Sequence, residues 1–222
     1  MKTSLVIYTL NEIDGMRVIM PEIKKDWYDE LIIFDADSSD GTIEYAKEHG
    51  YPIFIQKEKG AGAAFLESLQ QVTGDIIIAF SPDGNSIPEK IPELVTKIKE
   101  GYDIVIASRY FKDAKSYDDN AVTAFGNHMF TWLINFLFGS NITDSLVMFR
   151  AYRKDALNKL HIDAKNTSCG TQILLRAIKK KLKIAEIPGD EPPRIGGKSK
   201  MSPIRNGLRE LWAILKEFFI RG

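Results

Sequence analysis

The stretch Glu30-Leu-Ile-Ile-Phe-Asp-Ala-Asp-Ser-Ser-Asp-Gly-Thr42 joins an apolar run directly to a dense group of carboxylates. The run Glu30–Phe34 predicts a strand buried on both faces, because its apolar side chains follow one another without alternation. Carboxylates at the end of a buried strand cost free energy unless they are solvated, paired or bound to a ligand. Asp35, at the strand tip, is therefore a candidate binding residue, whereas Ser39 and Asp40 are equally consistent with capping the next helix.

Segments on either side of this stretch alternate between strand-like and helix-like patterns. We predict strands at 5–10, 30–34, 52–56, 75–80, 103–108 and 183–187. We predict helices after Asn11 and Glu12 and at 42–48, 60–72, 88–99, 122–138 and 167–181. Such alternation predicts βαβ units, and hence an α/β fold with a mostly parallel central sheet flanked by helices. Ligands of such sheets bind beyond the carboxyl ends of the strands.

Composition and charge set limits on the class of protein. The 222 residues include 30 basic and 30 acidic side chains, so the protein has no net positive charge to attract nucleic acid. We expect one domain over 1–200, followed by a C-terminal amphipathic helix over 201–222. The segment 176–205 is locally basic, with nine Lys or Arg against three acids. That excess suits a phosphate-rich ligand, an anionic membrane or simply a solvated face.

The location of the protein is also constrained. Cys169 is the single cysteine, which excludes an intrachain disulfide and a cysteine-based metal site and fits a reducing compartment. The N-terminus has no signal-peptide pattern. The longest apolar run, Met129–Phe138, is about half of what spans a bilayer. We therefore expect a soluble protein, or one peripheral to the inner membrane face, on the cytoplasmic side.

A second polar group follows the strand at 75–80, in Phe80-Ser-Pro-Asp-Gly-Asn85. A divalent ion such as Mg²⁺ or Mn²⁺ takes carboxylate and amide oxygens while substrate phosphates complete its shell. Asp83 and Asn85 can both face such an ion from an extended turn. Taken alone, Pro-Asp-Gly-Asn is also an ordinary turn sequence.

The segment Ile204–Phe219 predicts an amphipathic helix with one apolar stripe. The stripe consists of Ile204, Leu208, Leu211, Trp212, Leu215, Phe218 and Phe219. It is flanked by Arg205, Arg209, Lys216 and Arg221. Basic flanks are typical of helices that lie in a membrane interface. A stripe packed on its own domain, or on a second subunit in a homodimer, is an equal alternative.

The order of the segments resembles family-2 glycosyltransferases of the GT-A fold, closest to the dolichyl- or polyprenyl-phosphate sugar synthase branch. The motifs that carry the resemblance are Tyr8-Thr-Leu-Asn-Glu12, Asp35 to Thr42, Gly60-Ala-Gly-Ala-Ala64, Ser81 to Asn85, Ala107-Ser-Arg-Tyr110, Asp144, Phe149-Arg-Ala-Tyr-Arg153 and Gln172 to Ala177. Each motif is loose, but their common order over residues 4–200 is specific.

The resemblance implies where the nucleotide binds. The residues that would line its pocket are Thr9, Asn11, Glu12 and Asp35. Lys198 and Lys200 fall on the loop that closes over the site in this family.

The resemblance also implies a reaction centre. Asp83 and Asn85 would hold a divalent metal, Mg²⁺ or Mn²⁺, on the diphosphate. Arg109 would face the phosphates or the acceptor, and Asp144 would lie where the sugar is transferred.

Four positions depart from the family pattern. They are Ala36 in the base-binding pair, Ala61 in the glycine motif, Ser81 in the metal motif and Gln172 in place of an acid. Ser81 leaves a single charged metal ligand. These departures leave the identity of the donor open. They also leave open the alternative that the chain is a non-catalytic, degenerate relative that binds a sugar nucleotide.

The expected function is inverting transfer of a sugar from a nucleoside-diphosphate sugar to a lipid-phosphate or glycan acceptor in cell-envelope or polysaccharide synthesis. A hydroxyl acceptor needs a general base, for which Asp144 is the candidate, whereas a phosphate acceptor is already ionised. Because Gln172 is uncharged, the sequence slightly favours a polyprenyl phosphate. A sugar nucleotidyltransferase is a weaker alternative, since Tyr8–Glu12 lacks the glycine-rich loop such an enzyme needs.

Overall fold

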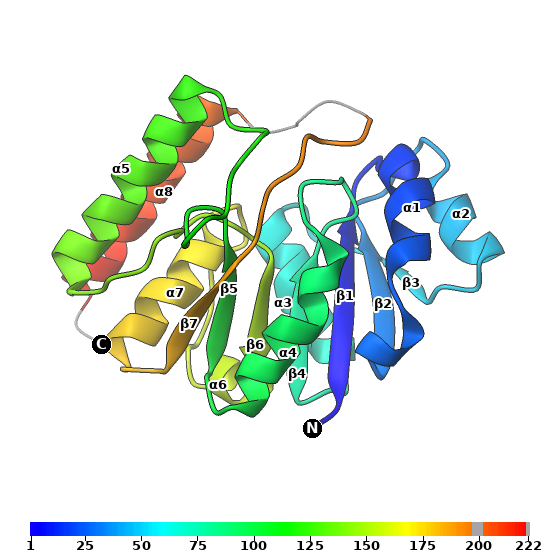
Figure 1. The fold of residues 1–222 in the computed structure, drawn as a ribbon, viewed down its shortest axis with the longest axis horizontal. Coiled ribbons are helices and arrows are strands. Elements are labelled where there is room, and N and C mark those ends of the chain that lie inside the picture. The colour runs from blue at the N-terminus through cyan, green and yellow to red at the C-terminus, as the bar shows by residue number, and fades with distance from the viewer. Residues whose placement is uncertain (197–201, 221–222) are drawn as a thin grey trace.

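The computed structural model describes residues 1–196 and 202–220. Its strands are β1 (Thr3–Thr9), β2 (Glu30–Asp35), β3 (Ile53–Ile55), β4 (Ile76–Phe80), β5 (Ile104–Ser108), β6 (Arg150–Arg153) and β7 (Ile184–Pro188). They form one seven-stranded sheet in the order β3-β2-β1-β4-β6-β5-β7 (Figure 1). Only β6 runs antiparallel to its neighbours β4 and β5. The predicted α/β fold with a mostly parallel sheet is confirmed.

Helices cover the sheet. They are α1 (Ile13–Ile19), α2 (Thr42–Glu48), α3 (Ala61–Gln71), α4 (Ile91–Lys99), α5 (Ala121–Phe138), α6 (Lys154–Asn158), α7 (Cys169–Lys179) and α8 (Pro203–Phe219). Short 3₁₀ turns are η1 (Met20–Glu22), η2 (Lys25–Trp27) and η3 (Pro88–Lys90). The strands and helices predicted from the sequence agree with the observed ones to within a few residues, but β6 and α6 were not predicted.

The missed strand β6 begins and ends with arginine, which hides its buried character in the sequence. Arg150 is nevertheless fully buried. Its guanidinium donates to the carbonyl oxygens of Ser145 at 2.6 Å and Gly170 at 3.0 Å. Backbone acceptors thus satisfy two of its nitrogens, while Nε has no partner among the described residues, and the strand fits between β4 and β5.

Successive residues of each central strand point into different helical layers. In β1, Leu5 and Ile7 pack in the cluster that contains Met16 of α1 and Leu94 of α4. Val6, between them, packs in the second cluster, with helices α3, α5 and α7. Burial on both faces explains why these strands are continuously apolar.

The parallel strands all end at one edge of the sheet, at the top of Figure 1. After β7 the segment 189–196 runs across this edge toward the loop that follows β4. The amide of Ile195 donates to the carbonyl oxygen of Asp83 at 2.7 Å, and Asn85 Nδ2 donates to that of Pro192 at 2.9 Å. These bonds attach the segment to the edge where ligands of such sheets bind.

Helices α5 and α8 lie side by side at the end of the molecule opposite α1 and α2 (Figure 1). Polar contacts hold α8 to α7: Thr171 Oγ1 donates to Glu210 at 2.6 Å, and Arg176 contacts Glu217 at 2.7 Å. Both glutamates are buried. The inward side of α8 therefore combines these two glutamates with the buried Ala213 and Ile214.

The apolar stripe of α8 points outward. Its members Ile204, Leu208, Leu211, Trp212, Leu215, Phe218 and Phe219 are all exposed. The helix does pack on its own domain, but it does so through its other side, which includes the core residue Ile214, and leaves the stripe largely exposed. Within the ranges 1–196 and 202–220, no helix has the length and apolar character needed to cross a bilayer.

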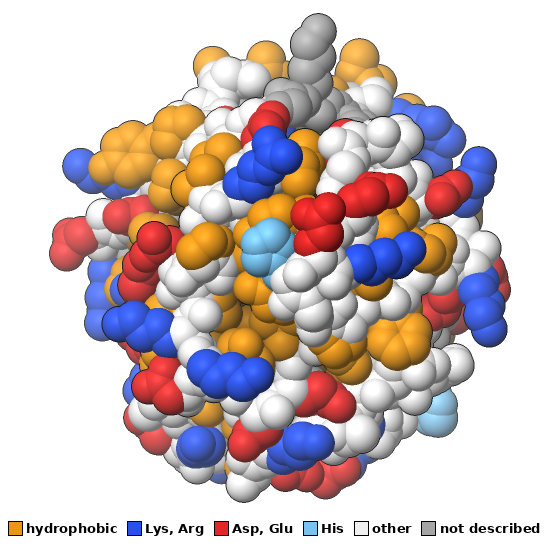
Figure 2. Space-filling view, turned by 90° about the vertical axis from the view of Figure 1, so that its right-hand side faces the viewer, with side chains coloured by type: hydrophobic (Ala, Val, Ile, Leu, Met, Phe, Trp, Pro, Cys, Tyr) orange, Lys and Arg blue, Asp and Glu red, His pale blue; other side chains and the backbone are white. Residues whose placement is uncertain are grey.

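Figure 2 shows the opposite end of the molecule, which carries α1 and α2. Acidic and basic side chains are interspersed there among apolar ones. This face lacks the extended basic surface that nucleic-acid binding requires.

One glycine sets how closely α1 approaches the loop after β4. A Cβ at Gly15 would lie 2.1 Å from the carbonyl oxygen of Pro82, which is backbone and cannot turn away. Gly126 in α5 offers a contrast, because a Cβ there would meet no atom within 4 Å. Helix α1 therefore packs directly against the backbone of Pro82 and Asp83 in the loop after β4.

We expect Gly15→Ala to lower the free energy of unfolding by about 1–3 kcal/mol, the usual cost of overpacking. The matched change Gly126→Ala should be neutral, or stabilising by up to about 1 kcal/mol through helix propensity. Urea denaturation of both variants measures the difference. Equal stability of the two variants would mean that α1 does not pack against Pro82.

Candidate active site

The loops after β1 and β2 are joined by hydrogen bonds around a buried carboxylate. Asp35 is fully buried and accepts from Thr9 Oγ1 and Ser38 Oγ, each at 2.6 Å, and from the Ser38 amide at 2.7 Å. Asn11 donates its amide to Ser38 Oγ at 2.7 Å and accepts from the Ser39 amide at 2.8 Å. The structure thus brings together Thr9, Asn11 and Asp35, three of the four residues expected to line the nucleotide pocket.

Asp40 has a structural role here. Its carboxylate accepts from the Thr42 amide at 3.0 Å, at the start of α2, and from the Ile13 amide at 3.1 Å, at the start of α1. Burial opposes ionisation of Asp40, but the Thr42 hydroxyl, which donates to it at 2.6 Å, and the two amides together outweigh burial and lower its pKa. The helix-capping interpretation of Asp40 is supported.

The fourth expected pocket residue, Glu12, meets the candidate metal ligand through an arginine. The guanidinium of Arg194 donates to Asp83 Oδ2 at 2.9 Å and to Glu12 Oε1. The other oxygen of Asp83 accepts from the Asn85 amide at 3.1 Å. One cation therefore joins two carboxylates from the loops after β1 and β4.

These residues fit a divalent ion only together with substrate oxygens. The described part of the chain contains no group of three or more His, Cys, Asp or Glu side chains able to hold a metal by themselves. Asp83 and Asn85 offer one carboxylate and one amide oxygen, a suitable pair when phosphates supply the remaining ligands. That Arg194 already pairs with Asp83 shows that the place attracts a cation.

A buried ion pair lies beyond the end of β5. Arg109 contacts Asp144 in bidentate geometry, with Nε–Oδ2 at 2.6 Å and Nη2–Oδ1 at 2.9 Å. Asp144 is 0% exposed and also accepts from the amides of Leu146 at 3.2 Å and Val147 at 3.1 Å. Both of its oxygens are engaged, so this geometry favours an orienting role for Asp144 over the base role suggested by the sequence.

Burial by itself would lower the pKa of Arg109. Hydrogen bonds and the charge of Asp144, with a smaller contribution from Glu191, reverse this and raise the pKa. Arg109 therefore carries a permanent positive charge in the site.

Glu191 is a site residue that sequence reasoning missed. Its carboxylate accepts from Arg109 Nη1 at 3.2 Å and from Ser116 Oγ. Nearby, Tyr110 donates its hydroxyl to Asp119. Burial and the charge of Asp119 raise the pKa of Glu191, against the opposing effect of Arg109.

Arg194, also missed, lies three residues further along the same segment. The available signal was position: both residues follow the last parallel strand, where the rule already applied to Asp35 and Asp83 predicts ligands.

Gln172 lies away from this site. It is buried between α7 and α8, where its Oε1 accepts from the amides of Asp163 and Ala164, both at 2.9 Å. Its Nε2 donates to Glu217 at 3.1 Å. The structure thus gives Gln172 hydrogen-bonding contacts with the segment before α7 and with α8, and the preference for a phosphate acceptor stays a prediction.

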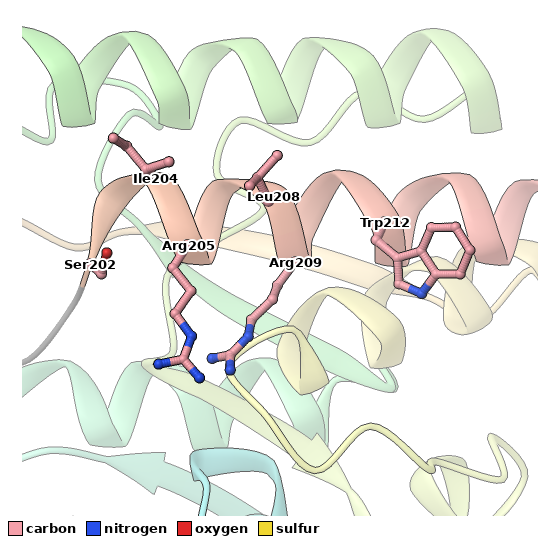
Figure 3. Close-up of a pocket in the computed structure, with 6 residues that line it drawn as sticks. All are labelled: Ser202, Ile204, Arg205, Leu208, Arg209 and Trp212. Carbon is pink, nitrogen blue, oxygen red and sulfur yellow. The ribbon is translucent and has the colours of Figure 1, made fainter.

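Two further features lie apart from the strand ends. Lys198 and Lys200 fall outside the described residues. A groove of about 510 Å³ runs along the outer side of α8 (Figure 3), where it is lined by Ser202, Ile204, Arg205, Leu208, Arg209 and Trp212.

Comparison with known proteins identifies relatives. The family model described as Glycosyl transferase family 2 matches residues 4–161. The dolichyl-phosphate hexose transferase of Haloferax volcanii is 27% identical over 206 residues, covering 92% of this chain and 88% of that protein. The dolichol-phosphate mannosyltransferase of Pyrococcus furiosus is 28% identical over 97% of this chain, which spans 64% of that protein's length, less than two thirds.

Solved structures share the fold. Glucosyl-3-phosphoglycerate synthase from Mycobacterium tuberculosis, in complex with Mn²⁺, uridine diphosphate and glucosyl-3-phosphoglycerate, superposes with a TM-score of 0.77 at 21% identity, covering 100% of this chain and 81% of that one. The same enzyme with Mg²⁺ and uridine diphosphate gives 0.75 at 20% identity, covering 100% of this chain and 80% of that one. The predicted GT-A fold is confirmed.

The ion pair of Arg109 and Asp144 makes a stability prediction. Asp144→Asn removes the charge that compensates a buried guanidinium, so the free energy of unfolding should fall by about 3–5 kcal/mol. The control Glu58→Gln breaks the exposed pair with Lys165, 2.6 Å, and should cost less than about 1 kcal/mol. Chemical denaturation compares the two. A wild-type midpoint for Asp144→Asn would show that the pair does not form as described.

Proposed function

Because the chain belongs to glycosyl transferase family 2, we propose that it transfers a sugar, with inversion, from a nucleoside-diphosphate sugar to a lipid-borne acceptor at a membrane surface. The observation that carries the proposal is the convergence of charged groups at the carboxyl edge of the sheet. Asp83 and Arg109 follow different strands, yet the short segment from Glu191 to Arg194 contacts both. A site with a carboxylate for a metal and a guanidinium for an anion suits transfer from a diphosphate.

The donor would occupy the hydrogen-bonded loops after β1 and β2. Thr9, Asn11 and Asp35 would hold one wall of that pocket in place, a role that the hydrogen bonds between the two loops support. The solved relatives bind uridine diphosphate, and this supports a nucleoside diphosphate as the leaving group here. Because Ala36 replaces a residue expected to contact the nucleobase, the structure does not identify which nucleobase the donor carries.

Asp83 and Asn85 would hold Mg²⁺ or Mn²⁺ against the diphosphate, as the complexes of the solved relatives suggest. When bound, such an ion neutralises the charge that develops on the leaving group. Arg194 would then leave Asp83. Its Nε is buried with no acceptor among the described residues, so the side chain still has a donor to offer a phosphate oxygen.

The acceptor would reach Arg109 from the side of α5 and α8. Both helices begin at the edge of the molecule where the parallel strands end (Figure 1). Their outer surfaces are strongly apolar. On α5 the exposed side chains are Val122, Phe125, Met129, Trp132 and Phe136, and α8 adds its whole stripe.

An exposed apolar surface of this extent marks an interaction site. Figure 3 shows the side chains of Arg205 and Arg209 turned to one side of α8, while those of Ile204 and Leu208 point to the other. Apolar side chains with neighbouring guanidinium groups suit the interface of an anionic membrane. Peripheral contact with the cytoplasmic membrane face would present a lipid-linked substrate to the site, whereas a homodimer is the competing use of the same surface.

The donor site is tested by thermal unfolding with uridine diphosphate or guanosine diphosphate, with and without Mn²⁺. A ligand at 100 times its Kd stabilises the folded state by about 2.7 kcal/mol. We expect Asp83→Ala to abolish the Mn²⁺-dependent part of the stabilisation by the nucleotide, and Asn85→Ala to reduce that part. Glu89→Ala, an exposed change in the following 3₁₀ turn, should behave as wild type.

Full stabilisation of Asp83→Ala would remove this residue from the site. Failure of the wild-type protein to bind either nucleotide, with or without metal, would instead favour a degenerate relative.

The membrane surface is tested by flotation with anionic vesicles at low salt. Trp132 and Trp212 are 63% and 70% exposed, and changing both to Ser should weaken partitioning at least tenfold, about 1.4 kcal/mol. Phe54→Ser, at a 40% exposed position on β3, is the matched control. Truncation is a poorer test, because α8 also supplies the buried Glu210 and Glu217.

No binding by the wild-type protein would contradict membrane contact. If the double variant turned a dimer into a monomer in light scattering, the surface would be a subunit interface.

A further inference from the structure

The candidate metal site already contains a positive charge that belongs to the protein. Arg194 Nη1 donates to Asp83 Oδ2 at 2.9 Å, and Arg194 Nη2 donates to Glu12. The side chains of Arg194, Asp83 and Glu12 are only 17%, 16% and 10% exposed, respectively. Ion pairs shielded from water to this degree interact more strongly than pairs on an open surface. The guanidinium is therefore firmly held at the place where a metal ion is expected.

Both oxygens of Asp83 are already engaged. Oδ2 accepts from Arg194, and Oδ1 accepts from the amide of Asn85 at 3.1 Å. A divalent ion lies about 2 Å from its oxygen ligands, so an ion on Oδ2 would come within about 5 Å of the guanidinium. Two cations at that separation repel each other strongly in a partly dehydrated place. Arg194 and a metal ion therefore compete for the same carboxylate.

The backbone that carries Arg194 is attached on both sides of it. The amide of Ile195 donates to the carbonyl oxygen of Asp83 at 2.7 Å. On the other side, the carbonyl oxygen of Pro192 accepts from Asn85 Nδ2 at 2.9 Å. These bonds place the guanidinium at Asp83 whenever the segment is attached. The guanidinium can then leave by rotation of its own side chain, while the segment stays bound to the loop after β4.

A nucleoside diphosphate would change the balance between the two cations because it brings negative charge of its own. Its oxygens complete the coordination shell of a divalent ion. The same oxygens attract a guanidinium group. With the diphosphate present, Arg194 can therefore release Asp83 at a smaller cost in free energy. Without it, an ion would have to displace Arg194 in exchange for one carboxylate and one amide oxygen.

We propose that Arg194 is a built-in competitor of the divalent ion, which keeps free metal off Asp83 and makes the ion enter together with the nucleotide. Arg194 is thus a specificity-determining residue, because it selects the metal–nucleotide complex over the metal alone. This inference rests on the proposed function and describes the order in which the same site is filled.

The test removes the charge through Arg194→Gln and measures Mn²⁺ binding to the protein without nucleotide. The loss of the electron paramagnetic resonance signal of free Mn²⁺ reports the bound fraction. We expect the variant to bind Mn²⁺ about tenfold or more tightly than wild type, because Asp83 no longer has to release a cation. Arg17→Gln removes the same charge from an exposed position on α1 and should change the affinity by less than about twofold.

Three further measurements locate the effect. Uridine or guanosine diphosphate should tighten Mn²⁺ binding about tenfold less in Arg194→Gln than in wild type, because the competitor that the nucleotide helps to remove is gone. Arg194→Lys keeps the charge but loses the planar fork, so its Mn²⁺ affinity should lie between the other two. Combined with Asp83→Ala, Arg194→Gln should bring no gain in Mn²⁺ affinity. Melting temperatures establish that each variant is folded.

Equal Mn²⁺ affinity of wild type and Arg194→Gln without nucleotide, together with normal Mn²⁺ binding in the presence of a nucleotide, would overturn the inference and leave the proposed function intact. An equal gain in Arg17→Gln would also overturn it, since the effect would then reflect overall charge. If the wild-type protein bound no Mn²⁺ with either nucleoside diphosphate, the metal site of the proposed function would itself be contradicted, and the inference with it.

Discussion

The buried ion pair between Arg109 and Asp144 organises the carboxyl edge of the sheet. It joins the end of β5 to the loop before β6. Glu186 of β7 holds the same loop, since it accepts from the amides of Thr143 at 2.9 Å and Asp144 at 3.1 Å. Because a buried charge must keep its partner, these three segments cannot separate without a large cost in free energy. This arrangement therefore fixes the positions of the neighbouring active-site groups.

Local patterns predicted six of the seven strands in the described part of the chain, and with them polar residues at the strand ends. Asp35 and Asp83 were found because each follows its own apolar run directly. Residues whose meaning depends on distant partners were not found. Glu191 and Arg194 bind partners 82 and up to 182 positions away, and nothing beside them in the chain reveals the contact. The contact of Gln172 with Glu217, 45 residues further on, was hidden from the sequence in the same way.

For helix α8 the sequence predicted the apolar stripe correctly, but it did not predict whether the stripe faces the protein or the solvent. The stripe predicted from the sequence exists, but the buried side of the helix is the one with Glu210 and Glu217. Their pairing with α7 accompanies the apolar contact that Ile214 makes with the core. A hydrophobic pattern states which residues share a face and not which environment covers that face.

The segment after β7 bears opposite charges three residues apart, and each is engaged with a different half of the site. Arg194 rests on the carboxylates expected to meet a metal, and Glu191 rests on the guanidinium expected to meet the acceptor. Both residues are carried by one short stretch of backbone, so a donor that draws Arg194 away from Asp83 could be felt at Glu191 and Arg109. Any such coupling between the two halves would be reciprocal, so an acceptor beside Arg109 would affect the donor to the same extent.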